Sequence, residues 1–311
     1  MFRLPTFIMK TILITGGTGL LGSHLIPLLK EAGFRIHVLS RSSNPIVYCD
    51  AVFTWNVDRG EIDERAFEGV THIVHLAGEG IADGRWTESR MKSIISSRVK
   101  SAELILSILK KRNQRIEVLV SGSAVGWYGA KTDNQLHTED ESPETDFMGE
   151  TCRLWEESAD AFDKVSSRIV KVRTGIVLAK ESGAFPKLIQ PFRMHLGAAL
   201  GSGKQQMPWI HIDDIVQVFY QAISNENYTG AINASATESC SNLEFSKTLA
   251  KILGRKLLPI HVPSVVLKMV LGDMSAVVLE GSRVSNSKLR NLGYQFKFEN
   301  LDEAIKNLVQ S

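Results

Sequence analysis

The sequence predicts an α/β protein built on a parallel sheet with helices on both faces. Strand-like apolar runs alternate with helical patterns through the first two thirds of the 311 residues. A glycine array follows the first apolar run directly, and small or polar residues follow most of the later runs. Parallel sheets bind ligands beyond the carboxyl ends of their strands. We therefore expect a Rossmann-type doubly wound sheet, completed by a small C-terminal α/β cap.

The first element is a strand over residues 11–15, followed by a glycine turn and a helix over residues 23–32. Gly16 permits the tight turn, Gly19 lets the backbone approach a pyrophosphate, and Gly22 lets the helix pack closely on the sheet. A turn that is glycine-rich by accident is the alternative. The order of strand, turn and helix favours dinucleotide binding by Thr15, Gly16, Gly17, Thr18, Gly19, Leu20, Leu21 and Gly22.

The second strand, residues 34–39, decides which dinucleotide is expected. Sites that prefer NAD usually place an acidic residue about 20 residues after the glycines, where it holds the ribose 2′-hydroxyl. This chain has Arg41 among serines instead. An arginine suits a 2′-phosphate, so NADP(H) is predicted over NAD(H); an ordinary exposed loop arginine is the alternative.

The next strands are expected at residues 51–55, 71–76, 117–120 and 168–172, with helices at 90–111 and 154–162. Residues directly after these strands should lie at the same edge of the sheet as the glycine turn. The further predicted cofactor-binding residues are Asn56, Leu76, Ala77, Gly78 and Arg173.

The chain is expected to form a dinucleotide-binding domain from residues 1–180, to which 205–240 return. Residues 181–204 and 241–311 are expected to form a substrate-side cap and a C-terminal domain, with a substrate-facing loop or lid at 182–207. Residues 1–8 are interpreted as a short extension. The apolar segment 262–279 contains Lys268 and Asp273 and is predicted to be a core helix.

Composition excludes several classes of partner. The formal net charge is +2, and no basic stripe interleaved with aromatic residues points to nucleic acid. The three cysteines have neither a pairing pattern nor metal-ligand spacing, so no metal is expected and a reducing compartment is favoured. We expect a cytoplasmic protein that acts on a small molecule, with no nucleic-acid or membrane partner.

Taken together, the motifs resemble those of extended short-chain dehydrogenases/reductases, the group that includes nucleotide-sugar epimerases. More narrowly, the chain is similar to the atypical branch called epimerase-family or cell-division-inhibitor-like proteins. The resemblance covers nearly the whole chain and implies a dinucleotide cofactor, the branch's own C-terminal domain and a possible homodimer. It rests on residues 15–22, 75–79, 85–87, 121–129, 152–156, 173–175, 191–203, 209–214 and 279–296.

The same resemblance places the family's catalytic residues. Extended members carry a Tyr-x-x-x-Lys pair, in which the lysine lowers the pKa of the tyrosine, and a serine that steadies the substrate oxygen. In this chain Met148 stands where the tyrosine is expected and Cys152 where the lysine is expected. Ser97 replaces the usual asparagine of the preceding helix. The standard proton donor is therefore missing.

Ser123 matches the family serine, and Tyr128 is the candidate to replace the missing acid. For each hydroxyl, a structural role in the loop is the alternative. Arg85 and Trp86 are candidates for gripping an anionic, planar ligand, although a solvated loop is equally plausible. Asp214 is interpreted as structural, for example as a helix cap.

Two functions remain open at this point. The first is an NADP(H)-dependent oxidoreductase or epimerase-like enzyme, acting on a small polar carbonyl or sugar-nucleotide-like substrate. The second is a non-catalytic NADP(H)-binding sensor or scaffold, for which the missing tyrosine and lysine are no loss.

Overall fold

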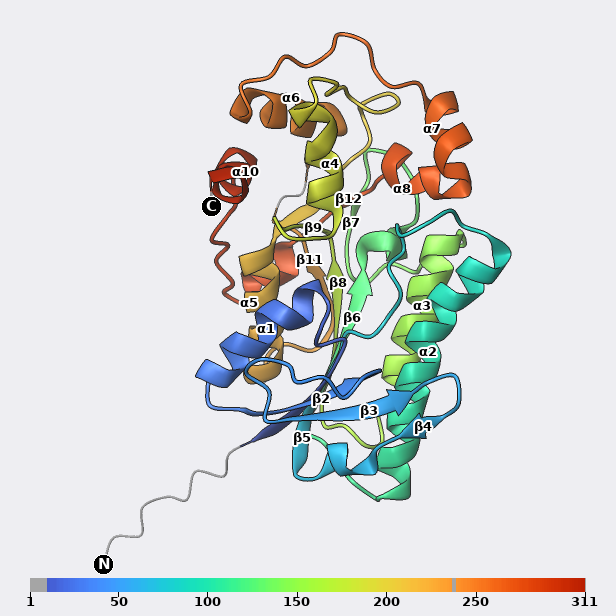
Figure 1. The fold of residues 1–311 in the computed structure, drawn as a ribbon, viewed down its shortest axis with the longest axis vertical. Coiled ribbons are helices and arrows are strands. Elements are labelled where there is room, and N and C mark those ends of the chain that lie inside the picture. Colours follow the sequence, from blue (N-terminus) through green and yellow to red (C-terminus); the bar gives the residue numbers. More distant parts are fainter. Residues whose placement is uncertain (1–9, 237–238, 311) are drawn as a thin grey trace, which may run out of the picture.

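A computed structural model describes residues 10–236 and 239–310, and an eight-stranded sheet forms its centre (Figure 1). The strand order is β11-β8-β6-β5-β1-β2-β3-β4, and every neighbouring pair is parallel except β3 and β4. Two short two-stranded sheets, β10-β9 and β12-β7, lie outside it. The strands are β1 (Thr11–Thr15), β2 (Arg35–Ser40), β3 (Ala51–Asn56), β4 (Glu61–Ile62), β5 (Val70–His75), β6 (Val118–Ala124), β7 (Leu136–His137), β8 (Ile169–Thr174), β9 (Ile176–Leu178), β10 (Trp209–His211), β11 (Gly230–Ala234) and β12 (Arg283–Val284).

Helices cover both faces of the main sheet, and each face has its own apolar core. Because side chains alternate along a strand, Ile12 and Ile14 of β1 enter one core and Leu13 enters the other. Figure 1 shows α1 and α5 over the first face and α2 and α3 over the second. These helices are α1 (Leu20–Glu31), α2 (Glu88–Lys111), α3 (Phe147–Asp160) and α5 (Ile212–Ser224).

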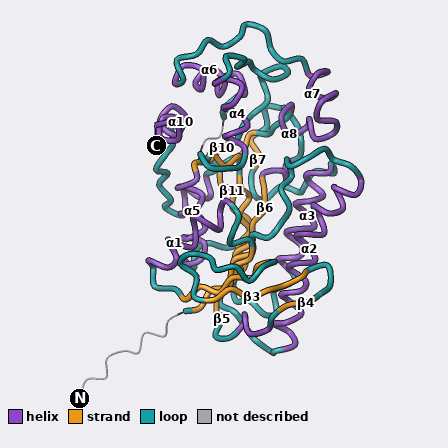
Figure 2. The backbone as a smooth tube through the Cα atoms, viewed as in Figure 1, coloured by secondary structure: helices purple, strands orange, loops and turns teal. Residues whose placement is uncertain are grey.

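Helices α4 (Ala184–Arg193), α6 (Asn242–Ile252), α7 (Ser264–Leu271), α8 (Ala276–Leu279) and α10 (Leu301–Gln310) gather beyond the carboxyl ends of the parallel strands and form the cap (Figure 2). The short helix α9 (Ser287–Asn291) packs against β11. Of the 3₁₀ helices, η1 (Glu64–Phe67) packs against β2 and β3, η2 (Val125–Tyr128) follows β6, and η3 (Gly272–Ser275) follows α7. The C-terminal region is mainly helical. It joins the rest of the chain through the β12–β7 pair and through α10, which packs against α6.

Asp214 ties this C-terminal region to the dinucleotide-binding part. Its buried carboxylate accepts hydrogen bonds from the Lys297 and Phe298 amides at 2.7 and 3.0 Å and from the Tyr294 hydroxyl at 3.1 Å. The N-cap of α5 is instead His211, whose Nδ1 accepts from the Asp213 amide. The structural interpretation of Asp214 is confirmed, although its role is that of an anchor and not of a helix cap.

The predicted fold class and the order of strands and helices are confirmed, whereas two segment predictions are wrong. Residues 262–279 do not form one core helix, because Gly272 adopts φ +63° and ends α7, which has no buried residue. Residues 182–207 are not all loop, since they contain α4. The extension at residues 1–8 lies outside the described residues. Within the described part of the chain, no helix has the length and apolar character needed to cross a membrane.

Candidate functional site

A cavity of about 860 Å³ opens at the carboxyl ends of β1, β2, β3 and β5. It therefore lies where sequence reasoning placed the dinucleotide. The predicted cofactor-binding residues Gly16, Gly17, Thr18, Gly19, Arg41, Asn56, Leu76, Ala77 and Gly78 line it, together with Leu39, Ser40, Trp55, Val57, Asp58, Glu79, Gly80, Asp83, Arg90, Ser93, Ser96, Ser97 and Ser101.

Two glycines of this region, Gly16 and Gly22, leave no room for a side chain. Gly16 adopts φ +69°, and a Cβ there would lie 2.8 Å from the Leu76 carbonyl oxygen. A Cβ on Gly22 would lie 2.4 Å from the Gly16 carbonyl oxygen. Gly19 is the N-cap of α1 and offers no side-chain oxygen to the first amides of the helix. Those amides and the positive end of the helix dipole are therefore available to an anion.

The far end of the cavity carries the residues expected to select the cofactor. Arg41 follows the last residue of β2, is exposed and lines the cavity. Asn56 ends β3, and its side-chain oxygen accepts a hydrogen bond from the Arg59 amide at 3.1 Å. Asp58 is the acidic residue of this end.

Thr15 supports the cavity wall from behind. Its Oγ1 accepts hydrogen bonds from the Leu76 and Ala77 amides, both at 3.1 Å, and is hydrogen-bonded to Nδ1 of His75 at 2.9 Å. Burial lowers the pKa of His75 to about 4, so the imidazole is neutral near pH 7. Its Nε2 is hydrogen-bonded to the Ser101 hydroxyl at 3.2 Å. Leu20, Leu21 and Gly22 likewise do not line the cavity; they shape the turn and the start of α1.

Arg173 does not line the cavity either, because it forms a buried ion pair with Glu156 of α3. Arg173 donates to the carboxylate from Nε at 2.8 Å and from Nη2 at 3.0 Å. Its guanidinium lies 3.9 Å from the centre of the Trp127 ring. Arg173 was predicted to bind the cofactor, but the structure places it away from the cavity, with its charge paired to Glu156.

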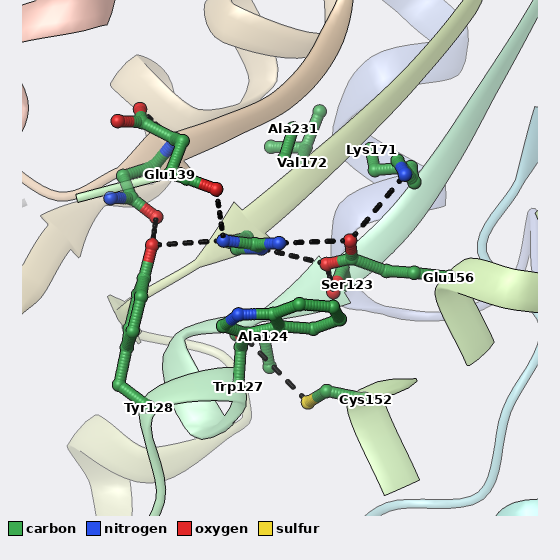
Figure 3. A network of polar contacts seen from close by, with 12 residues as sticks. Ser123, Ala124, Trp127, Tyr128, Glu139, Cys152, Glu156, Lys171, Val172 and Ala231 are labelled. Carbon is green, nitrogen blue, oxygen red and sulfur yellow. Dashed lines mark hydrogen bonds and ion pairs between the residues drawn. The ribbon is translucent and has the colours of Figure 1, made fainter. Parts of the chain in front are cut away.

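Ser123 and Tyr128, the two candidate catalytic residues, belong to the same network (Figure 3). The Ser123 hydroxyl donates to Glu156 at 2.7 Å, and the Tyr128 hydroxyl donates to the side-chain oxygen of Asn233 at 2.8 Å while accepting from Arg173. Both side chains are buried and neither lines the cavity. Burial raises the pKa of Tyr128 to about 12 despite the nearby Arg173, so this phenol is not prepared to give up a proton near neutral pH.

The position of the missing lysine is filled by a structural thiol. Cys152 is buried on α3, and its Sγ lies 3.6 Å from the Ala124 carbonyl oxygen. Burial raises the pKa of Cys152 to about 12, which keeps it a neutral thiol. Cys152 therefore supplies no charge to this edge of the sheet.

Arg98, which sequence reasoning did not single out, is a buried cation close enough to Cys152 to act on its charge. Its guanidinium packs 4.7 Å from the centre of the Trp155 ring and donates to the carbonyl oxygens of Ile94 and Glu79. Burial lowers the pKa of Arg98, and its Nε is enclosed without an acceptor among the described residues. No carboxylate of the described chain forms an ion pair with it. The sequence shows that Arg98 lies four residues after Ile94 on the predicted helix. It does not show that Arg98 packs against Trp155 of α3, because that contact depends on the tertiary fold.

The loop after β5 connects the cavity to the cap. Glu79 pairs with Arg90 at 2.5 Å and lines the cavity. Arg85 donates to the carbonyl oxygens of Met269 and Val270, so it holds the C-terminal end of α7. Trp86 packs edge-on against Phe147. In this structure both predicted ligand-gripping side chains therefore have structural partners.

Fold and site together define a dinucleotide-binding protein of the short-chain dehydrogenase/reductase type. The model of the NAD dependent epimerase/dehydratase family matches residues 12–234, and the domain of unknown function DUF1731 matches residues 262–308. The chain belongs to the NAD dependent epimerase/dehydratase family, and it carries the C-terminal domain that the resemblance predicted.

Relatives align over almost the full length. The chain is 30% identical to the epimerase family protein YfhF of Bacillus subtilis, over 96% of this chain and 97% of that protein. It is 34% identical to the chloroplastic epimerase family protein SDR39U1 homolog of Arabidopsis thaliana, over 96% of this chain and 87% of that protein. Among solved structures, human epimerase family protein SDR39U1, crystallised with NADPH, is 31% identical with a TM-score of 0.84, covering 97% of this chain and 100% of that one.

Proposed function

We propose that this protein binds NADP(H) in the cavity at the carboxyl edge of the sheet, with the 2′-phosphate at Arg41. The observation that carries the proposal is that one cavity is lined both by the glycine turn at residues 16–19 and by Arg41. The NADPH complex of the human relative supports the same cofactor.

The residues present suit each part of this dinucleotide. The glycine turn and the uncapped N-terminus of α1 fit a pyrophosphate, since they offer backbone amides and no competing side chain. Arg41 offers a guanidinium to the 2′-phosphate, a group that arginine recognises through paired hydrogen bonds. When bound, the nicotinamide ring would supply or accept a hydride.

Replacing Arg41 with alanine is expected to weaken NADPH binding and leave NADH binding unchanged. A hydrogen bond to a charged group contributes about 1.5–3 kcal/mol, so the Kd for NADPH should rise roughly tenfold to a hundredfold. Fluorescence titration of the nicotinamide measures both constants on the same protein.

Arg35→Ala is the matched control for this experiment. Arg35 is exposed at the opposite end of β2, away from the cavity, so its loss should change neither constant. Tighter binding of NADH than of NADPH by the unaltered protein would contradict the assignment of Arg41. A failure to bind either dinucleotide would remove the proposal itself.

A second candidate function is that of an oxidoreductase or epimerase-like enzyme acting on a small polar substrate. Arg98 favours it. Its guanidinium does not itself line the cavity, but it lies directly behind Gly78, which does, since a Cβ on Gly78 would be 3.0 Å from Arg98 Cζ. A guanidinium without a carboxylate ion pair among the described residues can stabilise negative charge that develops at that wall. The burial of Ser123 and Tyr128 favours the non-catalytic alternative, a sensor or scaffold that binds NADP(H) without turnover.

Turnover decides between these two candidates. NADPH fluorescence would be followed with a panel of carbonyl compounds and nucleotide sugars. For an enzyme, we expect Arg98→Gln to lower the rate on the order of a hundredfold, whereas Ser123→Ala should lower stability and not the rate of the folded protein. Binding of NADPH without oxidation across the panel would leave the sensor or scaffold. Loss of turnover in folded Ser123→Ala alone would restore Ser123 as a catalytic residue.

A further inference from the structure

Charge is distributed very unevenly along this chain. The whole sequence has 36 cationic and 34 acidic side chains, a formal net charge of +2. Segments 182–205 and 245–272 contain eight of the cations and no aspartate or glutamate, which leaves 28 cations against 34 acids elsewhere. The eight cations are Lys187, Arg193, Lys204, Lys247, Lys251, Arg255, Lys256 and Lys268.

These two segments lie side by side in the cap, although they are distant in sequence. The Leu258 amide donates to the Gly197 carbonyl oxygen at 2.9 Å, and the Val262 amide donates to the Ala199 carbonyl oxygen at 2.8 Å. In Figures 1 and 2, the chain between α6 and α7 runs over the upper end of the molecule. We call residues 193–197 and 254–270 the cap rim.

The cap rim also carries most of the large apolar side chains that the structure leaves exposed. Within the described residues, eight of the ten such side chains belong to it. Ile260 is 76% exposed, Met269 is 73% exposed and Val265 is 66% exposed. The other five are Met194, Leu196, Leu258, Val266 and Val270. Eight exposed apolar side chains on two segments that are hydrogen-bonded to each other indicate a contact site.

We propose that the cap rim docks onto the surface of an anionic lipid bilayer. The protruding aliphatic side chains of α7 and the preceding loop would enter the boundary between headgroups and acyl chains, while the neighbouring cations meet lipid phosphates. An anionic bilayer favours a protein surface with exposed apolar side chains, several cations and few acidic side chains. The proposal is independent of the cofactor, and it departs from the expectation that the protein has no membrane partner.

The charge of the cap rim argues against a second copy of the chain as its occupant. A two-fold dimer through this face would bring together two copies of segments that carry Arg193, Arg255, Lys256 and Lys268 and contain no aspartate or glutamate. Like charges across an interface are unfavourable. Neither the cavity of about 860 Å³ nor the second one of about 340 Å³ is lined by residues of the cap rim. Exposed side chains that project outward fit a deformable bilayer better than a preformed protein surface.

Co-sedimentation of the full-length protein with vesicles tests the proposal. We expect binding to vesicles of phosphatidylcholine mixed with phosphatidylglycerol, little binding to pure phosphatidylcholine, and weakening by salt. Val265→Ser with Met269→Ser should lower the partition coefficient about tenfold or more, because two inserted side chains are lost. Arg255→Gln and Lys256→Gln should each lower it about fivefold.

The matched control is Val47→Ser, because Val47 is 74% exposed but lies between β2 and β3. It should bind the mixed vesicles like the unaltered protein, and thermal unfolding verifies that every variant is folded. Equal binding to neutral and anionic vesicles, or no binding to either, would overturn the proposal. So would a dimer in light scattering that Val265→Ser with Met269→Ser dissociates, since the face would then join two copies.

Discussion

Replacement of Gly22 with alanine is expected to abolish detectable NADP(H) binding. The added Cβ would lie 2.4 Å from the Gly16 carbonyl oxygen and 2.6 Å from the Gly17 Cα. Both neighbours are backbone atoms of the turn that lines the cavity, so no side chain can move aside. The start of α1 must therefore shift away from the turn, and its first amides would no longer point at the pyrophosphate. We expect the Kd for NADPH to rise on the order of a hundredfold or more, with about 1–3 kcal/mol lost from the free energy of unfolding through overpacking.

Nicotinamide fluorescence and denaturant unfolding measure these two effects separately. Gly84→Ala is the matched control, because Gly84 has open space around its Cβ position and lies outside the cavity lining. It should bind NADPH like the unaltered protein. If Gly22→Ala binds NADPH normally while folded, the close approach of α1 to the turn is not what the cofactor requires.

The cavity was predictable because its residues follow from local rules. A glycine turn after an apolar strand, and small or polar residues after each parallel strand, place Gly16, Arg41, Asn56 and Ala77 at one edge wherever the sheet forms. These positions depend on the strand order and on little else. The direction of the side chains is set by the backbone itself.

Ser123, Tyr128 and Arg173 follow strands in the same manner, yet they face a buried network. Glu156 of α3, which is 33 residues from Ser123 in the sequence, accepts hydrogen bonds from Ser123 and Arg173, and Arg173 in turn donates to the Tyr128 hydroxyl. No local pattern reveals such a partner. The prediction of a core helix at residues 262–279 was wrong for a similar reason. The sequence shows that the segment is apolar, but whether other residues cover α7 depends on the packing of the cap.

Replacement of Glu156 with glutamine is expected to lower the free energy of unfolding by more than Gly22→Ala does. Glu156 and Arg173 are each about 2% exposed, and Glu156 accepts two hydrogen bonds from Arg173 and one from Ser123. The variant would leave the guanidinium buried without a counter-charge. Removing one partner of a buried ion pair costs about 3–5 kcal/mol, whereas replacing both by apolar residues is often nearly neutral. Glu156→Leu with Arg173→Met should therefore recover much of the loss in urea unfolding.

Glu157→Gln, one residue further along α3, is the control that isolates burial. Glu157 also pairs with an arginine, Arg153, but its side chain is 56% exposed, and an exposed pair contributes only about 0.2–1 kcal/mol. The two variants remove the same charge from the same helix. If Glu156→Gln costs no more than Glu157→Gln, then Glu156 does not hold Ser123 and Tyr128 in a rigid network. Both hydroxyls would then be free to turn toward a substrate, and the argument against their catalytic role would fall.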